Sequence, residues 1–394
     1  MQLNETVTAR GTTFVFTGEY EPEFRPAVDA FIGNYEVEEE IGSASALYVD
    51  GRKVFDIWAG FRDEAKTKPW GQDTIVCMMS VAKGISGIAF NILIDRGLVD
   101  PDAPVAKYWP EFAQNGKEGI LVRHVLDHTA GLPVVLDPLW PGAIYECDTI
   151  VAALEKQAPL WEPGTVAAYH IHTQGNILGE IVRRITGKRY VRFIQDELIA
   201  PLGLDYRIGN LSEADIARCA DLVPTVEGTL FARKDSDPDS LLAKGFLQHP
   251  REPIDVTLNS HGWRTAEIAS ANGHGTARSV AAIYGMVARG GELDGVRIMQ
   301  SETVRDMLAE QHNQTEQMQQ RPYHQGRGIL LNTEQSVWMG PNPHAFGHHG
   351  FGGSIGMGDP DAKIGFSYAC NKMHTRPDNG PRARRIIEAV YNIL

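Results

Sequence analysis

The sequence lacks the features that would assign a membrane or a secreted protein. None of its 394 residues belongs to an apolar run of roughly 18, the length that an ordinary membrane-spanning helix needs. Residues 1–6 show no basic region followed by an apolar stretch, so we expect no signal peptide and no membrane association. These absences predict a cytoplasmic protein.

Cysteine is scarce and positive charge is in deficit. The four cysteines are scattered and form no C-x-x-C pair, which favours buried free thiols in a reducing compartment over a disulfide framework: Cys77, Cys147, Cys219 and Cys370. Cys77 lies in an apolar run and is interpreted as a core thiol. With 37 basic and 50 acidic residues the net charge is −13, so phosphates would be repelled and nucleic acid is excluded as a partner.

Histidines gather at two places, but neither has the spacing of a metal site. A zinc hydrolase with an H-x-H motif such as His170–His172 adds an aspartate and another histidine close behind, whereas residues 173–175 read Thr-Gln-Gly. The second group is His344, His348 and His349, and no H-E-x-x-H occurs. We expect no metal and no cofactor. The oligomeric state stays open.

The pattern of apolar residues predicts strands at both ends of the chain and helices between them. A chain of this length is expected to form two packed lobes rather than one. Residues 46–58 read as a β-hairpin, because Asp50-Gly51 suits a tight turn between two β-prone runs. Further strands are predicted at 354–358 and 363–371, and helices at about 80–97, 122–128, 148–156, 173–186, 276–289 and from Pro381 onward.

Two polar stretches are interpreted as solvent-exposed. Glu36 to Glu40 is read as a solvated helix face, and 233–240 as an exposed loop. The chain is then divided into an α/β domain, residues 1–83 and 216–394, whose sheet comes from both chain ends, and a mainly helical domain, residues 84–215. The active site is expected between them.

Ser80–Lys83 reads Ser-Val-Ala-Lys, an S-x-x-K motif. Residues three apart on a helix share a face, so the amine can approach the hydroxyl. A serine hydroxyl needs a neighbouring base, and a lysine whose pKa is lowered by an apolar surrounding can act as one. A strand-like apolar run, 74–79, precedes the serine and an amphipathic helix follows it, the setting that a nucleophile requires.

Residues 74–83 resemble the nucleophile segment of class C β-lactamases and of their relatives, the family VIII carboxylesterases. Arg123–Pro133 is similar to the R-x-L-L-x-H-T-S-G-L-P block of this superfamily. Trp161–Thr165, then Tyr169, then Leu178–Val182 resembles its P-G-x…Y…L-G-x-I-I segment, and Phe346–Ser354 resembles its G-H-x-G-x-G-G-S strand. The matches follow one another over about residues 40–372.

The resemblance implies an α+β fold of the serine β-lactamase/DD-peptidase type, an antiparallel sheet flanked by helices beside an all-helical domain. It implies that Ser80 is acylated, with Lys83 and Tyr169 moving protons, Tyr169 either as a phenolate or through the lysine. The backbone N–H groups of Ser80 and Phe351 would form the oxyanion hole. His348 would be a substrate-side donor at the position of the K-T-G lysine, and His349 its outward neighbour, while Gly350 lets the backbone approach the substrate.

Two departures from the β-lactamase pattern favour a small-molecule ester over a β-lactam as substrate. The Y-x-N motif reads Tyr169-His170-Ile171, so the amide that grips a lactam side chain is missing. His348 replaces a lysine, the permanent cation that a lactam carboxylate favours. The expected activity is that of a carboxylesterase. An acyltransferase, and an amidase or β-lactam hydrolase using the same site, are the alternatives. Trp263 and Tyr145 are interpreted as substrate-binding, with Trp109, Trp140 and His274 as further candidate pocket walls.

Two other readings compete with Ser80 as nucleophile. Gly352–Gly356 is a G-x-S-x-G around Ser354, but a strand–turn–strand follows it, and His374 and Asp378 come in the wrong order for an α/β-hydrolase. A non-catalytic binding or structural module would have lost Ser80, Lys83 or Tyr169, yet all three are present.

Overall fold

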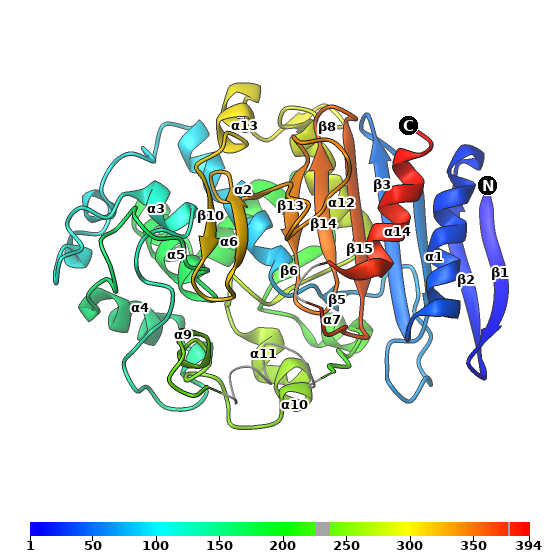
Figure 1. Cartoon of the computed structure of the whole chain (residues 1–394), viewed down its shortest axis with the longest axis horizontal. Coiled ribbons are helices and arrows are strands. Elements are labelled where there is room, and N and C mark those ends of the chain that lie inside the picture. Colours follow the sequence, from blue (N-terminus) through cyan, green and yellow to red (C-terminus); the bar gives the residue numbers. More distant parts are fainter. Residues whose placement is uncertain (226–236, 377–378) are drawn as a thin grey trace.

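A long antiparallel sheet runs from the middle of the molecule to its right-hand edge in Figure 1. The computed structural model describes residues 1–225, 237–376 and 379–394. Ten strands pair in the order β1-β2-β4-β3-β15-β14-β13-β12-β11-β10. Their bounds are β1 Gln2–Ala9, β2 Thr12–Tyr20, β3 Gly42–Val49, β4 Arg52–Gly60, β10 His312–Glu316, β11 Arg321–Gln325, β12 Leu330–Leu331, β13 Phe346–His349, β14 Ile355–Asp359 and β15 Ile364–Cys370.

The two ends of the chain meet in this sheet. β3 pairs with β15 along its whole length, from Val49 opposite Ile364 to Ser43 opposite Cys370. The predicted hairpin is confirmed as β3 and β4, and its turn residues Asp50 and Gly51 have the positive φ values of 47° and 83° that such a turn needs. The predicted strands near 354–358 and 363–371 are β14 and β15.

Helices cover both faces of the sheet. α12 (Ala277–Ala288) packs on one face against β3, β14 and β15. Its approach is close, because a Cβ on Gly365 of β15 would lie 2.2 Å from the Ala281 carbonyl oxygen. α1 (Arg25–Val37) and α14 (Gly380–Tyr391) pack together on the other face of the sheet. Leu47 of β3 and Phe366 of β15 belong to the same buried apolar cluster as these two helices. The fold class implied by the sequence is thereby confirmed.

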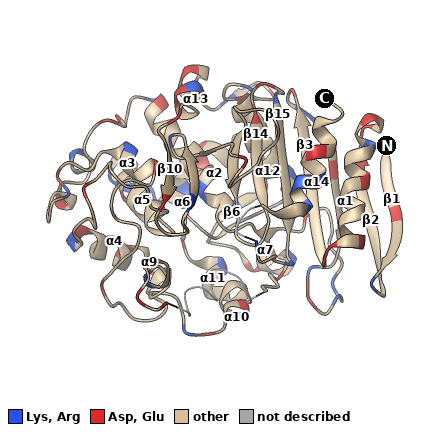
Figure 2. Ribbon diagram, viewed as in Figure 1, with Lys and Arg blue, Asp and Glu red and all other residues tan. Residues whose placement is uncertain are grey.

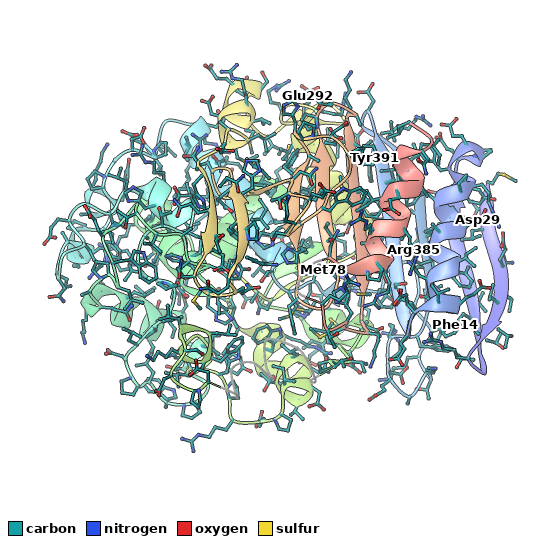
Figure 3. All side chains as sticks on the ribbon, viewed as in Figure 1. Phe14, Asp29, Met78, Glu292, Arg385 and Tyr391 are labelled. Atoms are coloured by element: carbon teal, nitrogen blue, oxygen red, sulfur yellow. The ribbon has the colours of Figure 1, made fainter. Side chains whose placement is uncertain are left out.

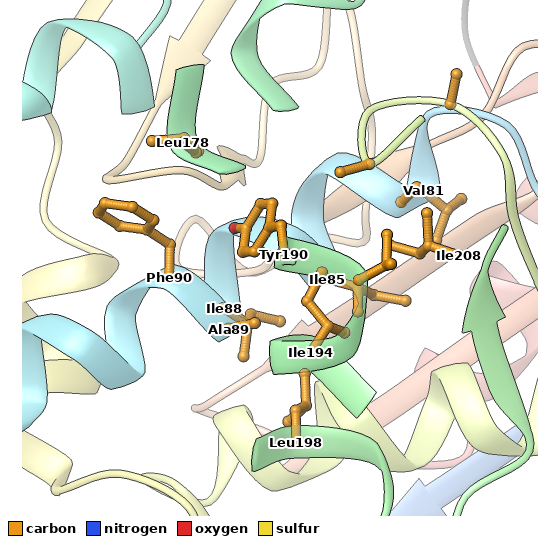
Figure 4. Close-up of a cluster of buried hydrophobic side chains, with 14 of the residues drawn as sticks. Val81, Ile85, Ile88, Ala89, Phe90, Leu178, Tyr190, Ile194, Leu198 and Ile208 are labelled. Atoms are coloured by element: carbon orange, nitrogen blue, oxygen red, sulfur yellow. The ribbon is translucent and has the colours of Figure 1, made fainter. Parts of the chain in front are cut away.

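A helical region lies beside the sheet, on the left in Figure 1. Its helices are α2 (Val81–Asp95), α3 (Val122–Leu126), α4 (Cys147–Lys156), α5 (Thr173–Thr186) and α6 (Tyr190–Ile194). α2 is buried on every side from Val81 to Leu93, and Figure 4 shows its apolar side chains meeting Leu178, Tyr190, Ile194 and Leu198. Burial of this kind holds α2 rigid at the base of the site.

Shorter elements complete the fold. A small sheet has the order β5-β7-β6 (Val76–Cys77, Gly273–Gly275, Tyr206–Ile208), and β8 (Glu292–Leu293) pairs with β9 (Val296–Arg297). β6 therefore adds a strand to the segment 84–215, which was expected to be mainly helical. The remaining helices are α7 (Glu213–Arg218), α9 (Leu241–Lys244), α10 (Ile254–Asn259), α11 (His261–Thr265) and α13 (Ser301–Met307), and the short helical turns are 22–24, 105–107, 110–112, 143–145 and 195–199.

The acidic stretch at Glu36–Glu40 is not entirely solvated, as the sequence had suggested. Glu36 is exposed, but Glu40 follows the end of α1, is 5% exposed and is paired with Arg382 at 3.0 Å. The patterning missed this because the partner lies at the other end of the chain. Residues 233–236 of the predicted loop, and Asp378, lie outside the described residues.

Charged residues of both signs are interspersed along the ribbon (Figure 2). No helix within residues 1–225, 237–376 and 379–394 is long and apolar enough to cross a membrane. All four cysteines are free, as predicted; Cys77, Cys219 and Cys370 are buried, whereas Cys147 is only partly buried.

Candidate functional site

Ser80 lies at the N-terminus of α2, and Met78 and Met79 connect it to the short strand β5. The preceding residue, Met79, has a φ of 49°, a left-handed conformation that is costly for a side chain of this size. Backbone bonds from Val81 N–H and Ala82 N–H to Met78 and Met79 hold this turn in place. Unlike Met78 and Val81, which are fully buried, Ser80 is only partly buried, so reagents in solution can reach it.

The structure brings Lys83 to Ser80 as the S-x-x-K spacing predicts. Lys83 Nζ lies 3.3 Å from Ser80 Oγ, 2.7 Å from the Ile171 carbonyl oxygen and 2.9 Å from the Ser270 carbonyl oxygen. The side chain is 2% exposed. Burial lowers the pKa of Lys83 well below its usual value, because the ammonium is desolvated.

Tyr169 joins this pair from the loop before α5. Lys83 Nζ lies 4.5 Å from the centroid of the Tyr169 ring, and the Ser80 hydroxyl is within hydrogen-bonding reach of the phenol. The backbone N–H of Tyr169 donates to Glu316 Oε2 at 3.1 Å, which anchors the loop to β10. Burial raises the pKa of Tyr169, while the Ser80 hydrogen bond and the charge of Arg321 oppose that rise. The net shift is upward, which favours the protonated phenol over the phenolate at neutral pH.

Arg321 was missed by the sequence reasoning. It lies on β11, with its guanidinium carbon 5.6 Å from the Tyr323 ring centroid and Nη1 3.2 Å from His349 Nε2. The Tyr323 ring lies 5.7 Å from that of Tyr169. No motif surrounds Arg321 in the sequence, and only the pairing of β10 to β13 brings it beside the site.

His348 is on the site side of β13, but the expected role as a donor does not fit its hydrogen bonding. Nδ1 lies 2.7 Å from the His349 carbonyl oxygen, which can only accept, so Nδ1 carries the proton of the neutral ring. Nε2 then carries a lone pair and no proton, so it can only accept a hydrogen bond. Burial lowers the pKa of His348 to about 3, so the ring is neutral at pH 7. His349, expected to face outward, is also buried, at 6% exposed.

Gly350–Gly353 form the turn that carries the candidate oxyanion hole. A Cβ on Gly350 would lie 2.0 Å from the Met78 carbonyl oxygen, so only glycine lets the end of β13 approach the start of α2. Gly352 and Gly353 have φ values of 99° and 114°, and Gly353 N–H donates to the Gly350 carbonyl. Phe351 follows Gly350 and is partly buried. The close approach places Gly350, the residue before Phe351, against Met78, two residues before Ser80.

Ile171 stands where the Y-x-N motif has its asparagine. Its backbone carbonyl, and not its side chain, accepts the hydrogen bond from Lys83 Nζ. His170 is fully buried with Nδ1 2.7 Å from the Ala168 carbonyl oxygen, and burial lowers its pKa to about 4. His172 contacts a ring cluster, with centroids 4.9 Å from His249 and 6.2 Å from Phe246. Burial also lowers the pKa of His172 well below its usual value, so His170 and His172 are both neutral at pH 7.

The predicted pocket walls separate into two groups. Trp263 is fully buried in α11, 6.0 Å from the His249 ring, and Tyr145 packs against the neighbouring Gly262. The other candidates are Trp109, Trp140 and His274, of which His274 pairs with Cys77, three residues before Ser80. Trp109 is fully buried with Nε1 bonded to Glu155, Trp140 is 51% exposed, and His274 is buried with Nδ1 2.7 Å from the Asn272 carbonyl oxygen.

The competing sites receive no support from the geometry. Ser354 is 3% exposed at the start of β14, and its Oγ accepts the Cys370 N–H at 3.3 Å. It precedes a strand rather than a helix. In the described part of the chain, no group of three or more histidine, cysteine, aspartate or glutamate side chains is arranged to hold a metal ion.

A cavity of about 900 Å³ lies away from Ser80, between α12, α13 and the turn from β14 to β15. Its floor is apolar, with Val287, Val304 and Leu331. The charged residues of its lining balance, with Arg289, Arg305 and Lys363 against Asp50, Glu310 and Asp361. No net charge therefore selects a ligand, and we assign this cavity no role.

Comparison with known proteins agrees with this geometry. A family model described as Beta-lactamase matches residues 28–391. The esterase/beta-lactamase LipL of Mycobacterium tuberculosis is 30% identical over 376 residues, covering 90% of this chain and 83% of that protein. A crystal structure of a family VIII carboxylesterase is 35% identical with a TM-score of 0.87, and a penicillin-binding protein homologue from Caulobacter crescentus is 31% identical with a TM-score of 0.87; each covers 96% of this chain and 100% of the other.

Proposed function

Because the chain belongs to the beta-lactamase family, we propose that it hydrolyses small carboxylic esters through an acyl-enzyme on Ser80. The observation that carries the proposal is the position of Lys83, buried with Nζ 3.3 Å from Ser80 Oγ. Esterase names among the relatives and a carboxylesterase among the similar structures support an ester as substrate.

The contacts of Lys83 suit a neutral amine acting as a base. A neutral amine has two N–H donors and one lone pair, and two of its three neighbours, the carbonyls of Ile171 and Ser270, can only accept. The lone pair is then directed at Ser80 Oγ. The lowered pKa of Lys83 keeps a fraction of the amine neutral near pH 7, as a general base requires.

Tyr169 completes a balanced proton cycle. Ser80 Oγ gives its proton to Lys83 and attacks the ester carbonyl, and the Tyr169 phenol protonates the departing alkoxide, leaving Lys83 as an ammonium and Tyr169 as a phenolate. A water molecule then gives a proton to Tyr169 and attacks the acyl carbon. On collapse of this second intermediate, Lys83 returns its proton to Ser80 Oγ and the carboxylic acid leaves.

The oxyanion of each tetrahedral intermediate would be held by the backbone N–H groups of Ser80 and Phe351. Such donors are set before the reaction begins, and the loss of one costs roughly 10²–10³ in kcat in other serine hydrolases. The division of the chain into residues 1–83 with 216–394 and residues 84–215, with the site between them, is part of this proposal. It is supported by the sheet strands at both chain ends and the helices α2 to α6 in the middle.

An ester suits this site better than a β-lactam. A lactam carboxylate needs a cation on β13, but His348 is neutral and offers an acceptor instead. The side chain of Ile171 offers no amide to grip a lactam substituent. Neither change disturbs the contacts among Ser80, Lys83 and Tyr169.

The test compares a short-chain p-nitrophenyl ester with a chromogenic cephalosporin, for the parent protein, Ser80→Ala and Ser354→Ala. We expect ester turnover to vanish in Ser80→Ala, to persist in Ser354→Ala, and to exceed lactam turnover in the parent. Mass spectrometry of the quenched reaction should find the acyl group on Ser80. Equal loss in a well-folded Ser354→Ala variant would refute the assignment. Transfer of the acyl group to an added alcohol faster than to water would make the protein an acyltransferase using the same site.

A further inference from the structure

The carbonyl of Gly352, one residue after Phe351, accepts hydrogen bonds from three directions. His374 N–H donates to it at 3.1 Å, Arg382 Nη2 at 3.3 Å and Cys370 Sγ at 3.6 Å. The same peptide group carries the Gly353 N–H, which donates to the Gly350 carbonyl at 3.1 Å, and that carbonyl shares its own peptide group with the Phe351 N–H. Holding the Gly352 carbonyl therefore constrains the orientation of the Phe351 N–H through one hydrogen bond. The turn that carries the candidate oxyanion donor therefore depends on side chains outside the site.

Arg382 is the charged member of these donors. It lies on α14, behind the sheet, with its side chain 3% exposed. Nη1 bonds Glu40 Oε2 at 3.0 Å, and Nη2 also donates to the Lys372 carbonyl at 2.9 Å. One guanidinium thus ties the Gly352 turn to residues 40 and 372.

Glu40 is satisfied in turn. Its Oε1 accepts a hydrogen bond from the Tyr368 hydroxyl, and its side chain is fully buried. A buried ion pair is a weak source of stability, because the desolvation of both charges offsets their attraction. A pair of well-packed apolar residues would stabilise the core about as well, so the presence of this ion pair is better explained by what Arg382 holds.

We propose that Arg382, oriented by Glu40, is a positioning residue for the oxyanion hole, acting through the Gly352 carbonyl on the N–H of Phe351. The inference rests on the proposed function of Ser80. It adds a role for α1 and α14, which lie on the face of the sheet opposite α12. Loss of the contact between Arg382 and the Gly352 carbonyl weakens binding of the tetrahedral intermediate and leaves binding of the planar ester unchanged.

A triple variant tests the role without leaving a charge buried alone. Glu40→Leu, Tyr368→Phe and Arg382→Met together remove the three polar groups and keep the volume, which is the replacement that buried ion pairs tolerate. We expect a folded protein with a thermal midpoint near that of the parent. Its kcat should fall at least tenfold with KM within about twofold, and its affinity for a trifluoromethyl ketone, which mimics the tetrahedral intermediate, should fall in parallel.

Two further variants keep the test decisive. Arg382→Lys retains a cation for Glu40 but lacks the second nitrogen that reaches Gly352, so kcat and ketone affinity should fall together here as well. Glu38→Leu with Arg385→Met is the control, because it removes a second ion pair between α14 and the residues after α1. This pair is 2.8 Å long and partly exposed, and Arg385 is labelled on α14 in Figure 3. Its removal should leave kcat and ketone affinity unchanged.

The outcomes separate the two proposals. A folded triple variant with the kcat and ketone affinity of the parent would overturn the positioning role, and so would an unchanged Arg382→Lys variant if the triple variant does not fold. If the Ser80→Ala variant still hydrolyses the ester at the rate of the parent, the proposed function itself is overturned instead.

Discussion

Lys83 Nζ lies 4.5 Å from the centroid of the Tyr169 ring. In the proposed cycle, the proton that leaves Ser80 makes Lys83 a cation at the moment when Tyr169 gives up its own proton. The two groups then form a transient ion pair in a water-poor site, where the attraction between charges is stronger than in water. The lysine thus assists the tyrosine as well as the serine.

The ionisation of Lys83 should govern activity at low pH. Because the neutral amine is the active form and its pKa is lowered, kcat/KM should rise with pH through that lowered pKa and reach a plateau well below pH 10.5. Lys83→Ala should lose several orders of magnitude in kcat. The pH–rate profile of p-nitrophenyl acetate hydrolysis measures both effects.

Lys117 supplies the matched control. It is also fully buried with a lowered pKa, and its Nζ donates to three backbone carbonyls, those of Gln114, Glu155 and Gln157, at 2.6–2.9 Å. Lys117→Ala should lower the thermal midpoint and leave the pH profile of the folded enzyme unchanged. A matching change of profile in Lys117→Ala would contradict the assignment of Lys83 as the base.

Arg321→Gln should lower kcat roughly tenfold, the effect of about 1.4 kcal/mol on the barrier. The Arg321 charge opposes the rise in the pKa of Tyr169, so its removal should move the alkaline limb of the pH–kcat profile to higher pH. Arg321→Lys, which keeps the charge, should retain most of the activity. An unchanged alkaline limb in Arg321→Gln would contradict the role of Tyr169 as a proton donor.

The other titratable groups around Tyr169 are Lys83, His128, Glu316, Tyr323 and His348.

Gly350→Ala should reduce kcat by about 10² or more, because its Cβ would lie 2.0 Å from the Met78 carbonyl oxygen and push the Phe351 N–H away from Ser80. KM should change much less. Gly33→Ala in α1 is the control, since a Cβ there meets nothing within 4 Å and helix propensity favours alanine by roughly 0.5–1 kcal/mol. It should be fully active and slightly more stable. Wild-type kcat in a folded Gly350→Ala variant would exclude the close approach as a catalytic requirement.

Buried neutral histidines should make the protein sensitive to mild acid. The pKa values of His170 and His348 are lowered to about 4 and about 3, against ~6.5 in an unfolded chain. Above pH ~6.5 both states are neutral and stability is full. Below it the unfolded chain binds protons that the folded one does not, so stability falls as pH drops toward 4.

Urea unfolding at pH 7.5 and pH 5.0 measures this effect. Each buried histidine should contribute about 2 kcal/mol to the difference between the two pH values. His348→Phe should reduce the difference by that amount. Equal differences in the parent and His348→Phe would show that His348 already carries a proton in the folded state.

Local patterns in the sequence were sufficient to predict the elements beneath the site. The helix at 173–186 is confirmed as α5, because its apolar stripe and the stop at Gly187, with a φ of 72°, act within a few residues. The position of Lys83 one turn after Ser80 follows from helix geometry in the same way. Strands β1 and β2 were not predicted, since their burial depends on α1 and on pairing with β4.

Contacts made by backbone atoms or by distant strands could not be predicted. Lys83 is held by the carbonyls of Ile171 and Ser270, and every residue type carries a carbonyl. Arg321 reaches the site only through the order of strands β10 to β13. The direction in which His348 offers a lone pair depends on one bond to a neighbouring carbonyl, which the motif does not encode.

The pairing of β3 with β15 has a consequence for synthesis on the ribosome. Strands β1 to β4 leave the ribosome early, but the partner of β3 is complete only when Cys370 has emerged. Until then one edge of β3 has no partner, and exposed strand edges of this kind are prone to pair with other chains. The nascent chain is therefore most vulnerable to aggregation late in translation, and Ser80 has its full surroundings only after nearly the whole protein has been made.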